Sequence, residues 1–391
     1  MKRVGLCIQY DGVDNYGTIL QAYATVKMIE GIGCEPILIK YKRRYTLPFI
    51  IQQLPRTFSI RFWKAQRRGD KRRRDIRSQW IFREYMEEKE KAFRTFRESF
   101  FSGYTIDKYY GYDELKKGST NYDTVLVGSD QLWLPDGLAT NFYNLMFVDD
   151  NVNKVSYATS FGVSSIPYKQ YKATREYLRR IDFLSVREEA GKKIIAEIAE
   201  RDAFVACDPV MLMDRKEWVR FADSDNLPPQ CVKGEYLLCY FLGGSKAERN
   251  CAKKVAEGLG LKIVNIRFVE DYYEIDETFG DIHPKGISPQ QFVKLIKEAS
   301  CIMTDSFHGT AFSIIFEKQF ISLYRFENDA KYSKNSRIDN ILKRLGLEDR
   351  LVTEKDPLKC MQGIIDYKKI SQERENWRME SELFLKNALG E

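Results

Sequence analysis

The feature that most constrains this chain is a repeated order of short apolar strand, polar loop and amphipathic helix. Val4–Tyr10 is apolar and β-prone, and the turn-rich stretch Asp11–Gly17 follows it. Apolar residues from Ile19 to Val26 then recur at the spacing of one helix face, before the buried-type strand Pro36–Ile39. Strand, helix and strand at this spacing favour a parallel sheet. The chain therefore opens as an α/β domain.

The same order recurs along the rest of the chain in two series. In the first series we expect further strands at Thr124–Gly128, Val155–Ala158, Phe183–Val186 and Ala203–Cys207. In the second series we expect strands at Tyr236–Leu242, Lys262–Ile266, Cys301–Thr304 and Phe320–Tyr324, and helices finish the chain. Two such series predict an α/β protein of two Rossmann-like domains that face each other across a cleft. We place these domains at residues 1–207 and 208–391, with the C-terminal helices in the second.

A basic stretch interrupts the first series between about residues 44 and 118. From Arg61 to Arg97 it holds 14 Lys/Arg and 6 Asp/Glu, a balance of +8, so the net charge of +7 leaves −1 for the remainder. Seven apolar side chains share one helical face and predict a helical insertion: Ile81, Phe82, Tyr85, Ala92, Phe93, Phe96 and Phe100.

The aromatic face and the cations Lys71–Arg74 together suit contact with an anionic membrane surface. Packing of the helix on its own domain or on a second subunit is the alternative. Because no nucleic-acid-binding motif accompanies the charge, we expect no nucleic-acid partner.

Composition excludes several classes of protein. With 43% apolar and 30% charged residues the chain can bury a full core, so it is not disordered. Its apolar runs stop short of the ~20 residues that a membrane-spanning helix needs, and its first residues lack a signal-peptide core. We therefore expect a cytoplasmic protein. The eight cysteines form no C-x-x-C pair, so we expect them reduced and mostly buried.

Four polar loops follow expected strands, at the sheet edge where open α/β sheets bind ligands. They are Asp11–Gly17, Gly128–Trp133, Ser185–Glu188 and Asp305–Gly309. The last loop precedes a helix, so its N–H groups predict an anion site at the helix N-terminus. It also contains His308, one of only two histidines in the chain.

At this loop the sequence resembles the polysaccharide pyruvyl transferase family. The segments that carry the resemblance occur in the family's order: Asn15–Ala22, Val127–Trp133, Tyr157–Gly162, Ser185–Glu188, Cys207–Val210, Thr304–Thr310 with Phe312–Phe316 and Phe320–Ile321, and Asn335–Ile338. The match runs from about residue 4 to 346, the basic stretch excepted.

The resemblance implies a glycosyltransferase-B-like pair of Rossmann domains. It also implies transfer of the enolpyruvyl unit of phosphoenolpyruvate to a sugar, usually as a cyclic ketal, with release of phosphate. The acceptor would be a surface polysaccharide or its lipid-linked precursor. We expect no cofactor and see no metal motif, although an assisting divalent metal at Asp130 or Asp305 stays open.

A donor with a phosphate and a carboxylate needs several fixed cations or N–H donors, and arginine pairs with both groups bidentately. Arg187 and Arg337 are the first candidates, and Arg325 is a weaker one. Two further pairs of candidates are Ser306 and the Gly309 amide, to hold phosphate, and Asn15 and Gly17, to admit a ligand to the backbone or to shape the turn.

The reaction also needs a proton at C3 of the enol. We assign this general-acid role to His308, because a bound anion raises the pKa of a neighbouring histidine. Asp305 is expected to orient His308 or to take a proton from the sugar hydroxyl, and Asp130 to do the latter from the opposite domain. For both acids the alternative is a loop-forming or helix-capping role.

Two other functions stay open at this stage. One is a nucleotide-sugar glycosyltransferase of the same fold, and the other is a non-catalytic binding homologue. Fold alone does not decide between them, because function depends on the site. The sequence does not determine the acceptor sugar, the ketal stereochemistry or the oligomeric state.

Overall fold

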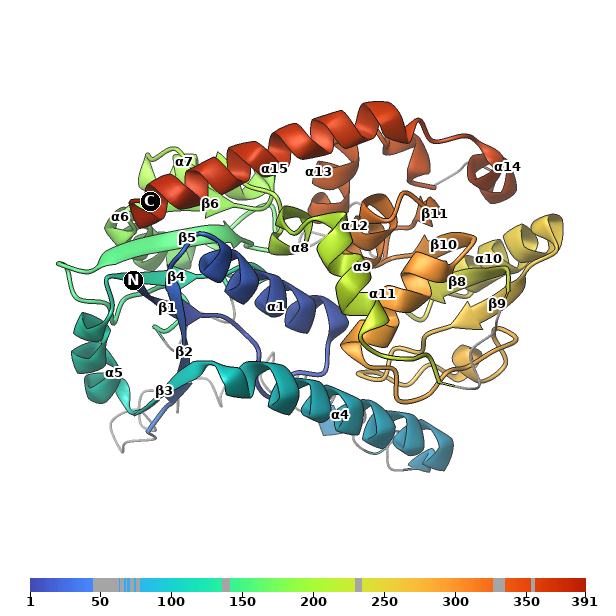
Figure 1. The fold of residues 1–391 in the computed structure, drawn as a ribbon, viewed down its shortest axis with the longest axis horizontal. Coiled ribbons are helices and arrows are strands. Elements are labelled where there is room, and N and C mark those ends of the chain that lie inside the picture. Colours follow the sequence, from blue (N-terminus) through green and yellow to red (C-terminus); the bar gives the residue numbers. More distant parts are fainter. Residues whose placement is uncertain are drawn as a thin grey trace.

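A computed structural model describes residues 1–44, 63, 67, 69–70, 74, 78–135, 141–228, 234–325, 335–352 and 356–391. Its strands form two parallel sheets (Figure 1), of order β3-β2-β1-β4-β5-β6-β7 and β11-β10-β8-β9. The strands are β1 Arg3–Cys7, β2 Glu35–Lys42, β3 Thr105–Tyr110, β4 Thr124–Val127, β5 Asn153–Thr159, β6 Phe183–Val186, β7 Phe204–Val205, β8 Tyr236–Tyr240, β9 Lys262–Asn265, β10 Cys301–Thr304 and β11 Gln319–Ser322.

Every strand expected from the sequence is present, and the two-sheet α/β fold class is confirmed. The central strands β4, β8 and β10 are buried along their whole length. Because helices cover both faces of a parallel sheet, such strands are apolar without alternation, which made them visible in the sequence.

Helices cover both sheets and link them. They are α1 Tyr16–Gly31, α4 Trp80–Phe100, α5 Tyr112–Gly118, α6 Tyr171–Arg180, α7 Glu189–Ala199, α8 Pro209–Leu212, α9 Arg215–Asp223, α10 Lys246–Leu259, α11 Pro289–Glu298, α12 Phe307–Ile315, α13 Ser336–Arg344, α14 Pro357–Gln362 and α15 Tyr367–Leu389. One apolar core runs between the sheets: Tyr16 of α1 stacks on Phe292 of α11 with ring centroids 4.3 Å apart.

The expected helical insertion at residues 44–118 needs a correction. The last part of this stretch belongs to the first sheet and is not inserted helix. β3 pairs in parallel with β2 from Ile37 to Lys42, and α5 follows it. β3 is an edge strand with its side chains largely exposed, so its polar sequence gave no apolar run to detect. The helical part that the structure describes is α4.

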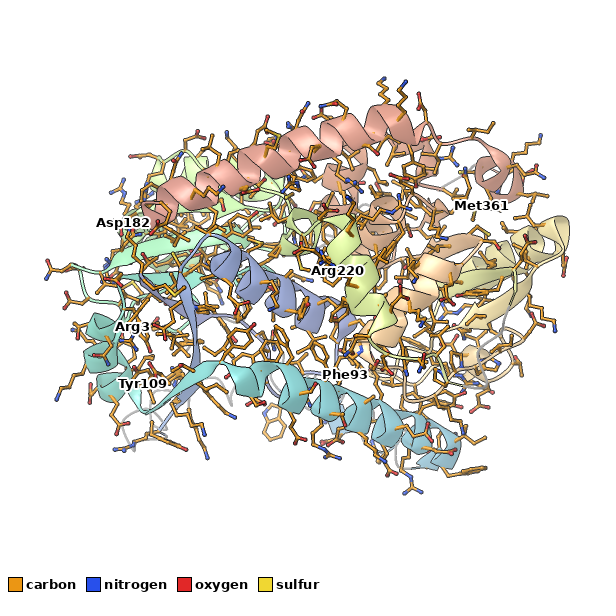
Figure 2. The ribbon with its side chains drawn as sticks, in the orientation of Figure 1. Arg3, Phe93, Tyr109, Asp182, Arg220 and Met361 are labelled. Atoms are coloured by element: carbon orange, nitrogen blue, oxygen red, sulfur yellow. The ribbon has the colours of Figure 1, made fainter. Side chains whose placement is uncertain are left out.

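The aromatic face of α4 is buried inside the protein. Phe82, Tyr85, Phe93 and Phe96 are all at most 6% exposed, and Phe93 contacts the ring of Tyr16. Figure 2 labels Phe93 on the side of α4 that faces the rest of the molecule. The helix therefore packs on its own chain, and its aromatic face is not available to a lipid surface. The cations at residues 71–73 lie outside the described residues.

The C-terminal helix α15 returns from the second sheet to the first (Figure 1). Trp377 donates to the Val205 carbonyl oxygen at 3.0 Å, and Phe384 stacks on Phe204 at 5.2 Å. The last helix of the expected second domain thus contacts the first sheet. The boundary between residues 207 and 208 stays a prediction.

Among the described residues, every helix is too short or too polar to cross a bilayer. The described cysteines are all free thiols, and most of them are buried, as expected.

Candidate active site

A cavity of about 210 Å³ lies where the strands of both sheets end. Most of the predicted site residues line it: Asn15, Asp130, Asp305, Ser306, His308, Arg325 and Arg337. The other three, Arg187, Gly17 and Gly309, lie behind this lining. Parallel strands bring their carboxyl ends to one edge, which is why loops far apart in sequence converge here.

Arg187 follows β6 and is 1% exposed. Its Nη1 donates to Oδ2 of Asp208 at 2.5 Å, and its guanidinium lies 4.6 Å from the ring centroid of Phe307. Burial acts to lower the pKa of Arg187, but Asp208 and Asp130 outweigh it and raise the pKa above its usual value. Within the described residues, its buried Nε and Nη2 have no hydrogen-bond partner. The Arg187 guanidinium is therefore a buried cation whose N–H groups at Nε and Nη2 can still donate to a ligand.

Arg337 brings a second guanidinium from α13 to the same cavity. It is 8% exposed, and among the described residues its side chain has no hydrogen-bond or ion-pair partner. Burial, and then Arg187, lower its pKa to about 10, so it stays charged at neutral pH. A hydrogen bond keeps α13 close to Arg187, because Nδ2 of Asn340 donates to the Arg187 carbonyl oxygen at 3.1 Å. Two buried guanidiniums with unfilled donors form a site for a small anion.

His308 lies in the first turn of α12 and is 7% exposed. Its Nε2 is 3.8 Å from Oδ2 of Asp208. Burial lowers the pKa of His308 to about 4, with Arg187 and Arg337 acting against the raising effects of Asp208 and Asp130. In the ligand-free protein the imidazole is therefore neutral at pH 7. The increase in the pKa of His308 that we expected from a neighbouring negative charge therefore requires an anion to bind.

Gly17 makes room for this imidazole. A Cβ atom at Gly17 would lie 2.0 Å from Nδ1 of His308. The glycine does not line the cavity, so its place in the structure is against the His308 ring and not against a ligand.

Asp130 lines the cavity from the loop after β4, with a positive φ of 85°. Its Oδ2 accepts from Thr18 Oγ1 at 2.7 Å, and its Oδ1 is 3.9 Å from Arg187 Nη2. Burial acts to raise the pKa of Asp130, but Arg187, His308 and the Thr18 hydrogen bond lower it below its usual value. Asp130 is therefore an ionised carboxylate facing the cavity.

Asp305 has the loop-forming role that was the alternative for it. Its carboxylate accepts from the backbone N–H groups of Leu242 at 2.6 Å and Gly243 at 2.9 Å. Burial raises the pKa of Asp305, against these hydrogen bonds and the neighbouring Arg325. The carboxylate that lies beside His308 is Asp208. Sequence reasoning missed this role, although Asp208 follows an expected strand and belongs to the segment Cys207–Val210.

Ser306 is the N-cap of α12, and its Oγ accepts from the Gly309 N–H at 3.4 Å. The Gly309 amide is therefore engaged inside the helix turn, whereas Ser306 reaches the cavity wall. A Cβ at Gly309 would lie 2.5 Å from Oγ1 of Thr304, so close packing on β10 requires the glycine.

Asn15 links the two sheets across the cavity. Its Oδ1 caps α1 by accepting from the Thr18 N–H at 3.2 Å, and its Nδ2 donates to Glu270 Oε1 at 3.1 Å. Glu270, which sequence reasoning did not single out, also lines the cavity. Within the described residues, no cluster of three or more His, Cys, Asp or Glu side chains is placed to hold a metal ion.

Solved structures with a similar fold have low sequence identity to this chain. The N-terminal domain of Candida albicans trehalose-6-phosphate phosphatase has a TM-score of 0.50 and 10% identity, and covers 100% of this chain and 97% of its own. UDP-GlcNAc 2-epimerase from Methanocaldococcus jannaschii has a TM-score of 0.45 and 12% identity, over 92% and 96% of the two chains. Arabidopsis thaliana UGT89C1 complexed with UDP has a TM-score of 0.45 and 8% identity, over 96% and 94%. At 10% identity, the likeness to the phosphatase domain shows a shared fold only.

No curated protein matches the sequence. A family model does: that of polysaccharide pyruvyl transferase matches residues 15–326, most of the chain. The match spans the loops that form the cavity from Asn15 to Arg325. The chain belongs to the polysaccharide pyruvyl transferase family.

Proposed function

We propose that the protein transfers the enolpyruvyl group of phosphoenolpyruvate to a saccharide and forms a pyruvate ketal. One observation carries the proposal: Arg337 and His308 line one cavity, and both Arg337 and the neighbouring Arg187 keep buried donors that have no hydrogen-bond partner among the described residues. Phosphoenolpyruvate carries a phosphate and a carboxylate, and two guanidiniums match these two groups in charge and in geometry.

In the proposed reaction His308 gives a proton to C3 of the enol, and C2 becomes oxocarbenium-like. A sugar hydroxyl attacks C2 and gives up its proton, the C2–O bond to phosphate breaks, and a second hydroxyl closes the ketal as it loses its own proton. Of the two hydroxyl protons, one restores His308 and the other leaves with the phosphate as hydrogen phosphate. Arg187 and Arg337 stabilise the charge on the departing phosphate, because fixed cations in a buried site need no reorganisation during the reaction.

Asp130 is the proposed acceptor of the sugar hydroxyl proton. It is an ionised carboxylate on the cavity wall, on the side of the first sheet. Its lowered pKa makes it a weak base, which suits a hydroxyl that becomes acidic only while it attacks a cationic C2. The proposed role of Asp305 is to hold together the loops that follow β8 and β10. The proposed role of Arg325 is to neutralise the charge of Asp305.

A lipid-linked acceptor would bring the enzyme to the cytoplasmic face of a membrane. Since the aromatic face of α4 is buried, we propose contact through the cations of the basic stretch alone. Lysine and arginine near an anionic surface contribute about 1 kcal/mol each. Co-sedimentation with anionic liposomes at low salt tests this contact, and no binding there would contradict it.

Calorimetric titration with phosphoenolpyruvate and, separately, with UDP-sugars tests the donor. We expect saturable phosphoenolpyruvate binding that Arg337→Ala weakens and that Arg220→Ala, an exposed arginine of α9 labelled in Figure 2, leaves unchanged. His308→Ala should bind the donor yet lose most phosphate release in the presence of acceptor. Binding of a UDP-sugar with no response to phosphoenolpyruvate would contradict the proposal and favour a nucleotide-sugar glycosyltransferase.

A further inference from the structure

Asp208 is a fully buried carboxylate that the proposed reaction does not use. It follows β7, and its Oδ2 accepts from Arg187 Nη1 at 2.5 Å and from Ser129 Oγ at 2.8 Å. The same oxygen lies 3.8 Å from Nε2 of His308. Its Oδ1 accepts from the Val210 N–H at 3.1 Å and caps α8. A single fixed oxygen thus faces both the donor-binding arginine and the general acid.

We propose that Asp208 is a positioning residue that couples binding of the donor to proton donation by His308. The inference rests on the proposed function and deepens it. Asp208 does not line the cavity, so it acts on the substrate only through Arg187 and His308. The α8 cap keeps the carboxylate in place when Arg187 turns its remaining donors to an anion.

The charges around His308 explain the coupling. Asp208 after β7 and Asp130 after β4 favour its protonated form, whereas Arg187 after β6 and Arg337 on α13 oppose it. The backbone of Gly17 in α1 packs on the ring and brings no side-chain charge. In the ligand-free site the two arginines and burial prevail, and the imidazole is neutral.

Bound phosphoenolpyruvate would place its negative charge on the two arginines. Their repulsion of an imidazolium is then cancelled, while the attraction of Asp208 at 3.8 Å persists. His308 therefore takes up a proton when the donor is in place, and it holds no proton to lose when the site is empty. An acid charged only beside its substrate avoids placing a third buried cation next to Arg187 and Arg337 in the free enzyme.

The chain allows this to be observed directly, because it has only two histidines. In protein labelled with ¹³C at histidine Cε1, NMR follows both rings through a pH titration, and His283→Gln assigns the His308 signal. We expect the His308 midpoint to rise by about 1–3 pH units when phosphoenolpyruvate saturates the wild-type protein. His283, whose backbone carbonyl accepts from Tyr85 of α4, does not line the cavity and should keep its midpoint.

Asp208→Asn tests the carboxylate itself. It keeps the size of the side chain and removes the charge, so the His308 midpoint of the donor-bound protein should lie about one pH unit or more below that of the wild type. The alkaline limb of kcat should move to lower pH by the same amount. Ser129→Ala is the matched control, because it removes one hydrogen bond to the same oxygen and leaves the charge. It should keep the wild-type midpoint in the donor-bound protein.

The results separate this inference from the proposed function. If phosphoenolpyruvate binds but the wild-type His308 midpoint does not move, the coupling is refuted while the donor stands, and this measurement needs no variant to fold. If Asp208→Asn keeps the wild-type His308 midpoint in the donor-bound protein, or lowers kcat equally at every pH, Asp208 has a merely structural role. If phosphoenolpyruvate does not bind at all, the proposed function fails and the coupling with it.

Discussion

Replacing Gly17 by alanine should inactivate the enzyme without touching a substrate-binding group. In the native structure the added Cβ would lie 2.0 Å from Nδ1, 2.6 Å from Cε1 and 2.7 Å from Cγ of His308. An ordinary contact begins at about 3.4 Å, so the imidazole has to move by more than 1 Å or rotate out of its place. The displaced group is the proposed general acid.

The expected loss follows from that displacement. A catalytic group misplaced by about 1 Å costs on the order of 100-fold in rate, so kcat for acceptor-dependent phosphate release should fall about 100-fold. Binding of phosphoenolpyruvate should change little, because Arg187 and Arg337 do not contact Gly17. Calorimetry for the donor and a phosphate-release assay measure the two effects separately.

Two controls make the argument refutable. Gly31→Ala, in the last turn of the same helix, adds a Cβ with nothing within 4 Å. It should keep full activity and gain up to about 1 kcal/mol of stability from helix propensity. In a His308→Ala background Gly17→Ala should cause no further loss, since both changes act on one group. Wild-type kcat in Gly17→Ala would refute the reasoning, as would a full extra loss in the double variant.

Three further outcomes are expected. Arg337→Lys should raise the KM for phosphoenolpyruvate about 10- to 100-fold in initial-rate assays, because an ammonium cannot reproduce a bidentate pair; an unchanged KM would remove Arg337 from the donor site. Asp130→Gly should unfold at higher denaturant concentration than Asp130→Ala, since a positive φ of 85° costs alanine about 1–2 kcal/mol; equal midpoints would contradict this. Burial and Asp305 raise the pKa of Glu248 from 4.5 to about 8. Between these two pH values the folded state keeps a proton that the unfolded chain loses. The free energy of unfolding should therefore fall as the pH rises from 4.5 to about 8. Glu248→Gln should flatten the fall in melting temperature between pH 5 and pH 8, and a parallel pH dependence would show that Glu248 is not its source.

The sequence predicted the central strands well because burial on both faces leaves a continuous apolar run. The sequence did not predict β3, because an edge strand needs no such run: none of its residues is fully buried, and Asp107 and Lys108 lie in its middle. The membrane interpretation of α4 failed for a related reason. An aromatic helix face predicts burial, but the pattern is the same whether lipid or Tyr16 covers it.

The place of the site could also be predicted, because loops that follow parallel strands share one edge of the sheet. The partners of each side chain could not. Asp305 and Asp208 both follow a strand and precede a helix, so their local sequences predict similar surroundings. The order of the strands in each sheet decides their partners. β10 lies beside β8, so Asp305 meets the Leu242 and Gly243 amides, and β7 lies beside β6, so Asp208 meets Arg187.

The glycines show how a motif can be right while its interpretation is incomplete. Gly17 and Gly309 belong to the segments that carry the resemblance to the family. Sequence reasoning gave the Gly309 amide to phosphate, and Gly17 either to a ligand or to the shape of the turn. In the structure one makes room for His308 and the other packs on Thr304. A glycine in a motif indicates only that another group lies close to the backbone. Here these groups are side chains of the protein itself, His308 and Thr304. Gly17 thereby fixes where His308 stands, and Asp208 lies beside its Nε2. In the part of the chain that the structure describes, Arg187 and Arg337 keep buried donors that have no hydrogen-bond partner. Most motif residues of this chain therefore position the side chains of His308, Arg187 and Arg337.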